Sequence, residues 1–252
     1  MLSAYFDESY NQRTLKEPNL PLVYTVAGYL SSVQQWKAFQ KEWDKALKSA
    51  GIPSHFHMTD FESRFGVYED WTNEKRIDFL QTLHSIIHKY VLKGFATSIV
   101  IEDYNKLTEK QKNEVFGEPH MCALFSCLKH IHTLFNELEL SEPIAYVFES
   151  NKKYDGLIAR AFSDMPDEAK KGYRIGSLSF AKKDCMPTQA ADILAYEITK
   201  ELANQLDNNS NRKTRLSMKN LAVSRIDEWF YMRTENFLES LDFMKRNGIY
   251  ED

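Results

Sequence analysis

Apolar and polar positions along this chain follow two patterns, one typical of strands and one typical of helices. Short runs rich in aliphatic, aromatic and β-branched residues predict strands, at residues 2–6, 22–30, 95–101, 144–148 and 175–180. Longer stretches repeat an apolar residue every three or four positions, which predicts amphipathic helices, at residues 32–50, 73–92, 121–138, 154–162 and 188–206. Strands interleaved with helices are typical of an α/β fold, so we expect a mixed sheet of about five strands with flanking helices.

Two segments of the chain need separate comment. Residues 55–71 are aromatic and charged, and they are too long for a simple connector. We expect them to be irregular and to pack over the candidate site as one wall. Residues 207–220 are polar and rich in asparagine, which predicts a mobile loop, and residues 221–252 predict a C-terminal amphipathic helix.

Composition is that of an ordinary globular protein, with 43% hydrophobic and 27% charged residues. Glycine and proline are scarce, at 9 and 7 residues, which argues against an all-β sandwich because such folds need many turn residues. No internal repeat or linker divides the chain. We therefore expect one domain over residues 1–252, with a core at about 1–206 and helical insertions.

Charge and cysteine content bear on partners and location. The net charge is −4, so the chain lacks the overall basic footprint of a nucleic-acid-binding protein, although a local basic groove is compatible with it. Three cysteines without CxxC spacing argue against a disulfide framework or a thiolate zinc site, and we expect a cytoplasmic protein. No uncharged run approaches the roughly 20 residues that span a bilayer, so we expect no membrane association. The lack of a Gly-rich phosphate loop argues against a nucleotide cofactor.

Two carboxylates directly follow apolar strands. Asp7 follows Ser3–Phe6 and Glu149 follows Ile144–Phe148, within the similar local sequences FDES and FES. An acid at the carboxyl end of a buried strand points into the crevice where open α/β sheets bind ligands. The alternative is an acid that only caps a turn or a helix. Glu8 adjoins Asp7, and because neighbouring strand residues face opposite sides of a sheet, the two share a site only if the strand ends there.

A third carboxylate, Asp192, interrupts a helix that is otherwise apolar almost all round. A buried carboxylate is costly unless it is paired or binds a metal. Gln189 lies three residues earlier and shares the helix face of Asp192. The alternative to a metal ligand is a buried ion pair, for which Lys182 or Lys183 is available.

Together, these three carboxylates offer the hard oxygen ligands that Mg²⁺ or Mn²⁺ prefers. Two such ions about 4 Å apart can activate a water and stabilise the leaving oxygen of a phosphodiester. We therefore expect the carboxylates of Asp7, Glu149 and Asp192 to converge on one side of the sheet.

Two motifs resemble a known family. The segment FDES at residues 6–9 and the segment QAADILAY at residues 189–196 resemble the two end motifs of the DUF3800 family, bacterial and phage proteins to which an RNase H-like fold is attributed. His57 and Asp60 resemble that family's His-containing segment after the first long helix. The resemblance covers residues 3–200. The chain departs from the family pattern at Tyr10, where glycine is usual, and at Thr188, where an apolar residue is usual.

The resemblance implies an RNase H-like fold with a cluster of three acids. Asp7 would lie on the first strand, Glu149 on the fourth strand and Asp192 on the C-terminal helix of the core. Side chains in the surrounding motifs would have accessory roles: Glu8, His57, Asp60, Gln189 and Lys183.

We accordingly expect a metal-dependent nuclease, a hydrolase of phosphodiester bonds in DNA or RNA that uses Mg²⁺ or Mn²⁺. One rival is a non-catalytic nucleic-acid-binding or interaction protein with the same fold, which the lack of a strong basic surface favours. Another rival is a metal-dependent phosphatase acting on small phosphoesters, which would use the same ligands.

Two other groups of residues are weaker candidate sites. His84 and His88 have a helical spacing that suits zinc, but the segment lacks the glutamate of HExxH, and we expect a solvated helix face there. The best local basic group either contacts phosphates or is simply solvated surface, and it consists of Lys182, Lys183, Arg212, Lys213, Arg215 and Lys219.

Overall fold

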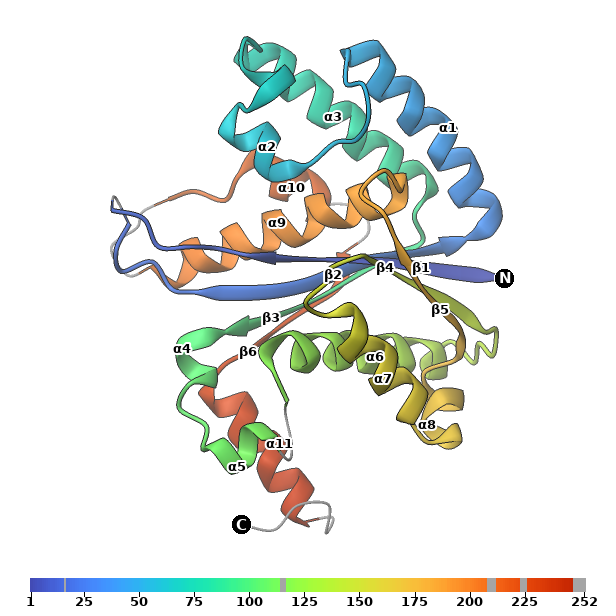
Figure 1. Cartoon of the computed structure of the whole chain (residues 1–252), viewed down its shortest axis with the longest axis vertical. Helices are drawn as coiled ribbons and strands as arrows, with labels where there is room; N and C mark the ends of the chain where they lie inside the picture. The colour runs from blue at the N-terminus through green and yellow to red at the C-terminus, as the bar shows by residue number, and fades with distance from the viewer. Residues whose placement is uncertain (16, 114–116, 208–211, 223–225, 247–252) are drawn as a thin grey trace.

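The computed structural model describes residues 1–15, 17–113, 117–207, 212–222 and 226–246, and it contains one sheet covered by helices on both faces (Figure 1). The sheet has six strands in the order β5-β4-β1-β2-β3-β6. Their bounds are β1 Leu2–Tyr10, β2 Val23–Ser32, β3 Lys93–Val100, β4 Ile144–Glu149, β5 Ile175–Ala181 and β6 Ile226–Met232.

The sheet is mixed, as expected for an α/β fold. Strand β1 pairs antiparallel with β2 and parallel with β4, while β2 pairs antiparallel with β3. Strands β3 with β6 and β4 with β5 are parallel pairs. The residues of β2 are buried almost throughout, whereas the outer strand β5 is largely half-exposed, in keeping with its alternation of serine with apolar residues.

Two helical layers enclose the sheet. One layer contains α1 Val33–Ala50, α2 Met58–Ser63, the 3-10 helix η1 Gly66–Tyr68, α3 Asn73–Tyr90, α9 Met186–Leu206 and α10 Leu216–Ala222. The other contains α4 Ile101–Tyr104, α5 Glu109–Gln111, α6 Pro119–Glu137, α7 Asp155–Asp164, α8 Asp167–Gly172 and α11 Thr234–Arg246. Figure 1 shows α9 lying directly on the sheet in the first layer and α6 doing so in the second.

A separate apolar core lies on each face of the sheet. On the α9 side, Trp43 and Phe39 of α1 pack with Ile193 of α9. On the α6 side, Phe6 and Phe148 stack on each other at a ring-centroid distance of 5.4 Å. Aromatic side chains are buried on both faces, and their large apolar areas stabilise the fold. Because side chains alternate along a strand, these two cores also decide which residues of β1 and β4 face α9.

Helix α1 begins and ends where its sequence predicts. The hydroxyl of Ser32 accepts a hydrogen bond of 3.2 Å from the main-chain N–H of Gln35, which caps the first turn. Gly51 ends the helix with φ of +79°, a left-handed conformation that glycine adopts without steric cost. Ser32 is both the last residue of β2 and the cap of α1, so the helix starts where the strand ends.

The C-terminal part of the chain differs from its prediction. Residues 221–252 were expected to form one amphipathic helix, but among the described residues of that region α10 ends at Ala222, Ile226–Met232 is a sixth strand and Thr234–Arg246 is a separate helix. Met232 and Phe237 belong to the core on the α6 side, so the core continues beyond residue 206. The expectation failed because β6 pairs with β3, and a long-range pairing leaves no local signal that separates a short apolar strand from a helix.

Two loop predictions were also wrong in part. Within the predicted mobile loop 207–220, residues 208–211 lie outside the described residues, and Leu216 onwards forms α10. Residues 55–71, predicted to be irregular, contain α2 and η1. Their helices are only 6 and 3 residues long, too short for helical periodicity to stand out in the sequence.

Candidate active site

Asp7 and Glu149 lie at neighbouring positions on adjacent parallel strands. Phe6 of β1 is paired with Phe148 of β4, and each acid is the next residue along its strand. Phe6 and Phe148 face the α6 core, so strand alternation directs both acids to the α9 side. Tyr5 lies two residues before Asp7 and therefore faces the same side of the sheet. Its ring centre lies 5.1 Å from that of Trp36 of α1, which places this side in the α9 layer.

Asp192 approaches the same place from above the sheet. It lies on the first half of α9, whose residues around it are almost all buried, and only 5% of Asp192 is exposed. Its Oδ2 accepts a hydrogen bond of 2.6 Å from the main-chain N–H of Met58, at the start of α2. The three acids therefore come from β1, β4 and α9, elements far apart in the sequence.

The three carboxylates interact electrostatically. The pKa of Asp7 is raised well above its usual range, first by burial and then by the charges of Asp192 and Glu149. Burial likewise raises the pKa of Asp192, to about 7, against the lowering effect of the Met58 N–H. The pKa of Glu149 is also raised overall, first by burial and then by the charge of Asp192, and the charge of Lys183 opposes that rise. In the described ranges, none of the three forms an ion pair within 4.0 Å of a lysine or arginine.

The acids converge without forming a closed ligand set. Among the residues that the structure describes, no group of three or more His, Cys, Asp or Glu side chains is arranged to hold a metal ion. The chemistry of the donors nevertheless suits a hard divalent cation. The buried Asp7 and Asp192 and the half-buried Glu149 bring like charges together, and none of them forms an ion pair with a lysine or arginine among the described residues.

Glu8 lies on the opposite face of β1, as strand alternation requires. Its Oε1 accepts a hydrogen bond of 2.6 Å from Nδ2 of Asn151, near α7. Burial raises the pKa of Glu8 to about 7, and the Asn151 hydrogen bond opposes that rise. Strand β1 does not end after Asp7 but continues to Tyr10, where the family pattern has glycine, so Glu8 is not brought to the α9 side.

Residues 55–71 pack beside the acids, as predicted. In addition to the Met58 N–H bond to Asp192, the main-chain N–H of Phe56 donates to Oε1 of Gln189 at 3.2 Å. His57 is half-buried, and its pKa is lowered by burial and by Lys183, which keeps the imidazole neutral at pH 7. Its Nδ1 lies 3.8 Å from Oδ2 of Asp60. His57 and Asp60 thus lie near the acids on one wall of the site.

Gln189 and Lys183 have different relations to the acids. Oε1 of Gln189 accepts two hydrogen bonds, one from the Phe56 N–H and one of 2.9 Å from the indole N–H of Trp43. Nε2 of Gln189 donates a hydrogen bond of 3.1 Å to the main-chain carbonyl of Lys183. Gln189 is therefore a positioning residue that ties the 55–71 segment and the turn at Lys183 to α9. The Lys183 ammonium lies near enough to lower the pKa of both Glu149 and Asp192.

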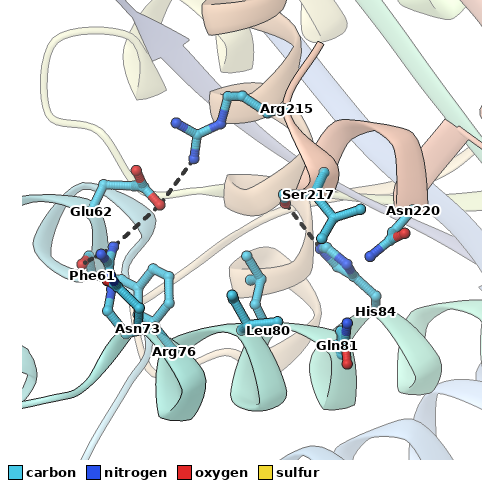
Figure 2. A pocket seen from close by; sticks show the side chains of 12 residues that line it. Phe61, Glu62, Asn73, Arg76, Leu80, Gln81, His84, Arg215, Ser217 and Asn220 are labelled. Atoms are coloured by element: carbon cyan, nitrogen blue, oxygen red, sulfur yellow. Dashed lines mark hydrogen bonds and ion pairs between the residues drawn. The ribbon is translucent and has the colours of Figure 1, made fainter. Parts of the chain in front are cut away.

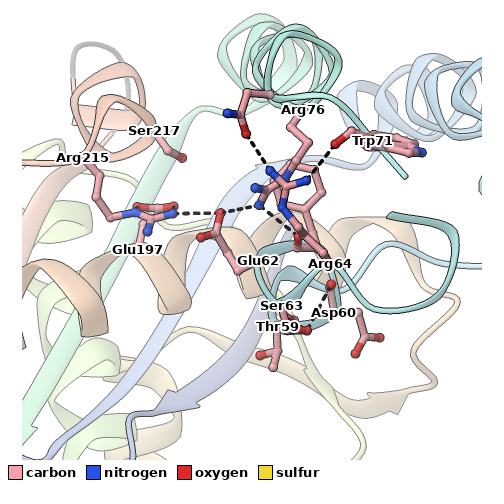
Figure 3. Close-up of polar contacts among 12 residues, drawn as sticks. Thr59, Asp60, Glu62, Ser63, Arg64, Trp71, Arg76, Glu197, Arg215 and Ser217 are labelled. Atoms are coloured by element: carbon pink, nitrogen blue, oxygen red, sulfur yellow. Dashed lines mark hydrogen bonds and ion pairs between the residues drawn. The ribbon is translucent and has the colours of Figure 1, made fainter. Parts of the chain in front are cut away.

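A second polar cluster lies next to the acids and was not predicted as a unit. Figure 3 shows Arg215 between Glu197 of α9 and Glu62 of α2, with Arg76 reaching Glu62 from α3. The Arg215–Glu62 and Arg215–Glu197 distances are 2.9 and 3.0 Å. Glu197 is fully buried, and burial raises its pKa while Arg215 opposes that rise. The sequence signal that could have predicted this cluster is Glu197 itself, because a glutamate within a mostly apolar helix needs a partner of opposite charge.

A cavity of about 380 Å³ lies behind this cluster, between α3 and α10 (Figure 2). His84 lines it and is 3% exposed, with Nε2 at 3.3 Å from the Ser217 hydroxyl. Burial lowers the pKa of His84 to about 4. The predicted solvated face at His84 is therefore wrong, because α10 covers it, and α10 itself was not predicted.

Comparison with other proteins adds no family assignment. No model of a known protein family matches the chain, and no curated protein matches it. None of the described helices has the length and apolar character that crossing a membrane requires.

Proposed function

We propose that this protein is a divalent-metal-dependent hydrolase of phosphodiester bonds in nucleic acid, with an RNase H-like acidic cluster of the kind that its resemblance to the DUF3800 family implies. The observation that supports this most directly is the convergence of Asp7, Glu149 and Asp192. Burial raises the pKa of all three acids, the charges of Asp192 and Glu149 raise that of Asp7 further, and the charge of Asp192 raises that of Glu149. The ionised cluster is therefore unfavourable unless a cation or a proton neutralises it. Such an arrangement is more typical of a functional site than of a structural one.

The residues fit Mg²⁺ or Mn²⁺ by donor type, with Asp7, Glu149 and Asp192 as the holders. When bound, the metal would supply an activated water and charge stabilisation at the phosphate. The Met58 N–H holds one oxygen of Asp192, which leaves its other oxygen available. His57 is neutral at pH 7 and lies near Glu149, so it is placed to move a proton at the rim of the site. Lys183 provides a positive charge beside the acids for an anionic substrate.

A second candidate is a non-catalytic nucleic-acid-binding or interaction protein with the same fold. It is favoured by the lack, among the described residues, of a preformed group of three metal-ligating side chains. A metal-dependent phosphatase is a third candidate, since the same acids would serve it.

The test is cleavage of end-labelled single-stranded and duplex DNA and RNA with Mg²⁺, with Mn²⁺ and with EDTA. Cleavage is expected with metal only, and Asp7→Asn and Asp192→Asn should each reduce it at least a hundredfold. Glu8→Gln serves as the matched control, because it removes a neighbouring carboxylate on the opposite face of β1. Hydrolysis of p-nitrophenyl phosphate without cleavage of any polynucleotide would favour the phosphatase. Nucleic-acid binding without hydrolysis of either substrate would favour the non-catalytic protein.

A further inference from the structure

A groove of about 620 Å³ opens in the helical layer that contains α9, and none of the three acids lines it. It is lined by side chains of α2, of α9 and of the segment before α10, among them Thr59, Tyr196, Lys200, Lys213 and Arg215. Thr59 directly follows Met58, whose N–H binds Asp192. The groove and the acidic cluster therefore share a wall.

Helix α9 connects the two sites along one stripe. Asp192, Tyr196 and Lys200 are spaced by four residues, so they lie on the same side of the helix at a rise of about 6 Å per step. Burial raises the pKa of Tyr196, and the charge of Asp192 adds a smaller contribution in the same direction. The Lys200 ammonium lies 5.7 Å from the centre of the Tyr196 ring. An acid, an aromatic ring and a cation thus follow one another along α9.

The groove has an excess of positive charge. Arg215 is held by Glu62 and Glu197, and Arg212 is paired with Glu17. By contrast, Lys200 and Lys213 form no ion pair within the part of the chain that the structure describes. Two lysines whose charges are not neutralised by nearby carboxylates are available for an anionic ligand that enters the groove.

We infer that this groove binds a single strand of nucleic acid. Lys200 and Lys213 would contact its phosphates, and Tyr196 would stack on a base. A positively charged groove that carries an aromatic platform is the combination that binds single strands without sequence preference. With Lys183 on the other side of the acids, the strand would run along α9 and place one phosphate at the acidic cluster. The inference rests on the proposed function for this last step, but not for binding in the groove itself.

The test is the affinity of the whole protein for fluorescein-labelled 20-nucleotide oligo(dT) and oligo(U), measured by anisotropy in EDTA, where metal-dependent cleavage does not occur. The double variant Lys200→Gln/Lys213→Gln is compared with Lys37→Gln/Lys41→Gln on the exposed outer face of α1. Both double variants remove the same charge, so any effect of net charge alone affects them equally.

The groove variant is expected to bind at least tenfold more weakly at 0.1 M salt, and the slope of log affinity against log salt should fall by about two, one for each lysine that contacts a phosphate. The α1 variant should bind as wild type does. Tyr196→Leu should lose about tenfold and Tyr196→Phe should lose little, because phenylalanine keeps the stacking surface. Thermal melts identify any variant that fails to fold, and the lysine variants decide the matter if Tyr196→Leu does.

Two results would overturn the inference: no binding of either oligonucleotide, or equal losses in the two lysine double variants. A preference for oligo(dT) or oligo(U) identifies the substrate as DNA or RNA, and either supports the groove. Binding that depends on Lys200 and Lys213 without any cleavage in Mg²⁺ or Mn²⁺ would support the groove and refute the proposed hydrolase. If the groove variant instead binds and cleaves nucleic acid as wild type does, the proposed hydrolase is supported and the groove is refuted.

Discussion

The main-chain N–H of Met58 donates a hydrogen bond of 2.6 Å to the buried carboxylate of Asp192. This bond joins the start of α2 to the first half of the sheet-facing helix α9, across more than a hundred residues of sequence. It occupies one carboxylate oxygen with a neutral donor rather than with a cation. Asp192 is thus held in place by a neutral donor, and several consequences can be measured.

Replacement of Asp192 by asparagine should leave the metal-free protein as stable as wild type or more stable, by about 1–3 kcal/mol at pH 8. The raised pKa of Asp192, about 7 against an ordinary 3.8, means that the folded wild type binds the proton more tightly than the unfolded chain. Wild type therefore loses stability as pH rises from about 4 to above 7, whereas the variant avoids that loss. Thermal melts in EDTA across this pH range provide the measurement.

Mn²⁺ should raise the melting temperature of wild type, because a ligand that binds only the native state stabilises it. Asp192→Asn should gain much less from the same addition. If Asp192 instead serves a buried ion pair with Lys183, the variant would melt far lower in EDTA, since breaking such a pair costs about 3–5 kcal/mol. Mn²⁺ would then shift neither protein.

Gln189→Leu should destabilise the protein by about 2–4 kcal/mol, in contrast to Asp192→Asn on the same helix face. Leucine would leave the indole N–H of Trp43 and the main-chain N–H of Phe56 without their shared acceptor in a buried place. Urea unfolding measures the loss. Gln189→Glu is the informative companion, because it keeps an acceptor for both donors. Equal stability of Gln189→Leu and wild type would show that these hydrogen bonds contribute little.

Gly28→Ala should destabilise the fold by about 1–3 kcal/mol or more through overpacking. A Cβ at Gly28 would lie 2.5 Å from the carbonyl oxygen of Tyr5 and 2.4 Å from a ring carbon of Phe6, immediately before Asp7. Gly156→Ala is the matched control, since a Cβ there meets nothing within 4 Å and alanine favours the helix α7. A melt in which both variants match wild type would mean that β1 and β2 can separate to admit a methyl group at no cost.

The buried His84 should make stability fall as the solution is acidified from about pH 6.5 to pH 4. Its folded pKa, about 4, is below the ordinary 6.5, so the unfolded chain takes up a proton that the folded protein resists. Stability from this group is complete above pH 6.5 and is lost towards pH 4, by about 1–3 kcal/mol. His84→Gln should flatten this part of the curve of unfolding free energy against pH. A variant whose curve parallels that of wild type would contradict this origin.

Local sequence patterns were sufficient to predict the α/β class and most of the elements. The five predicted strands are present at nearly their predicted positions, because each is a compact apolar run between turns. Helix α1 is marked at both ends by Ser32 and Gly51, residues that satisfy helix termini locally. The acids Asp7 and Glu149 could be singled out for a similarly local reason, since each is a polar residue at the end of an apolar strand.

What sequence alone could not decide depends on contacts between distant segments. Pairing of β3 with β6 turned a predicted helix into a strand, and α10 buried His84 on a face that was expected to be solvated. The parallel register of Phe6 with Phe148 brought Asp7 beside Glu149, while Glu8 was left on the other face of the sheet. The groove at Tyr196 and Lys200 likewise exists only because α2 and the segment before α10 close on α9. Periodicity states which face of an element is apolar, but the partner that covers that face is chosen by packing over the whole chain.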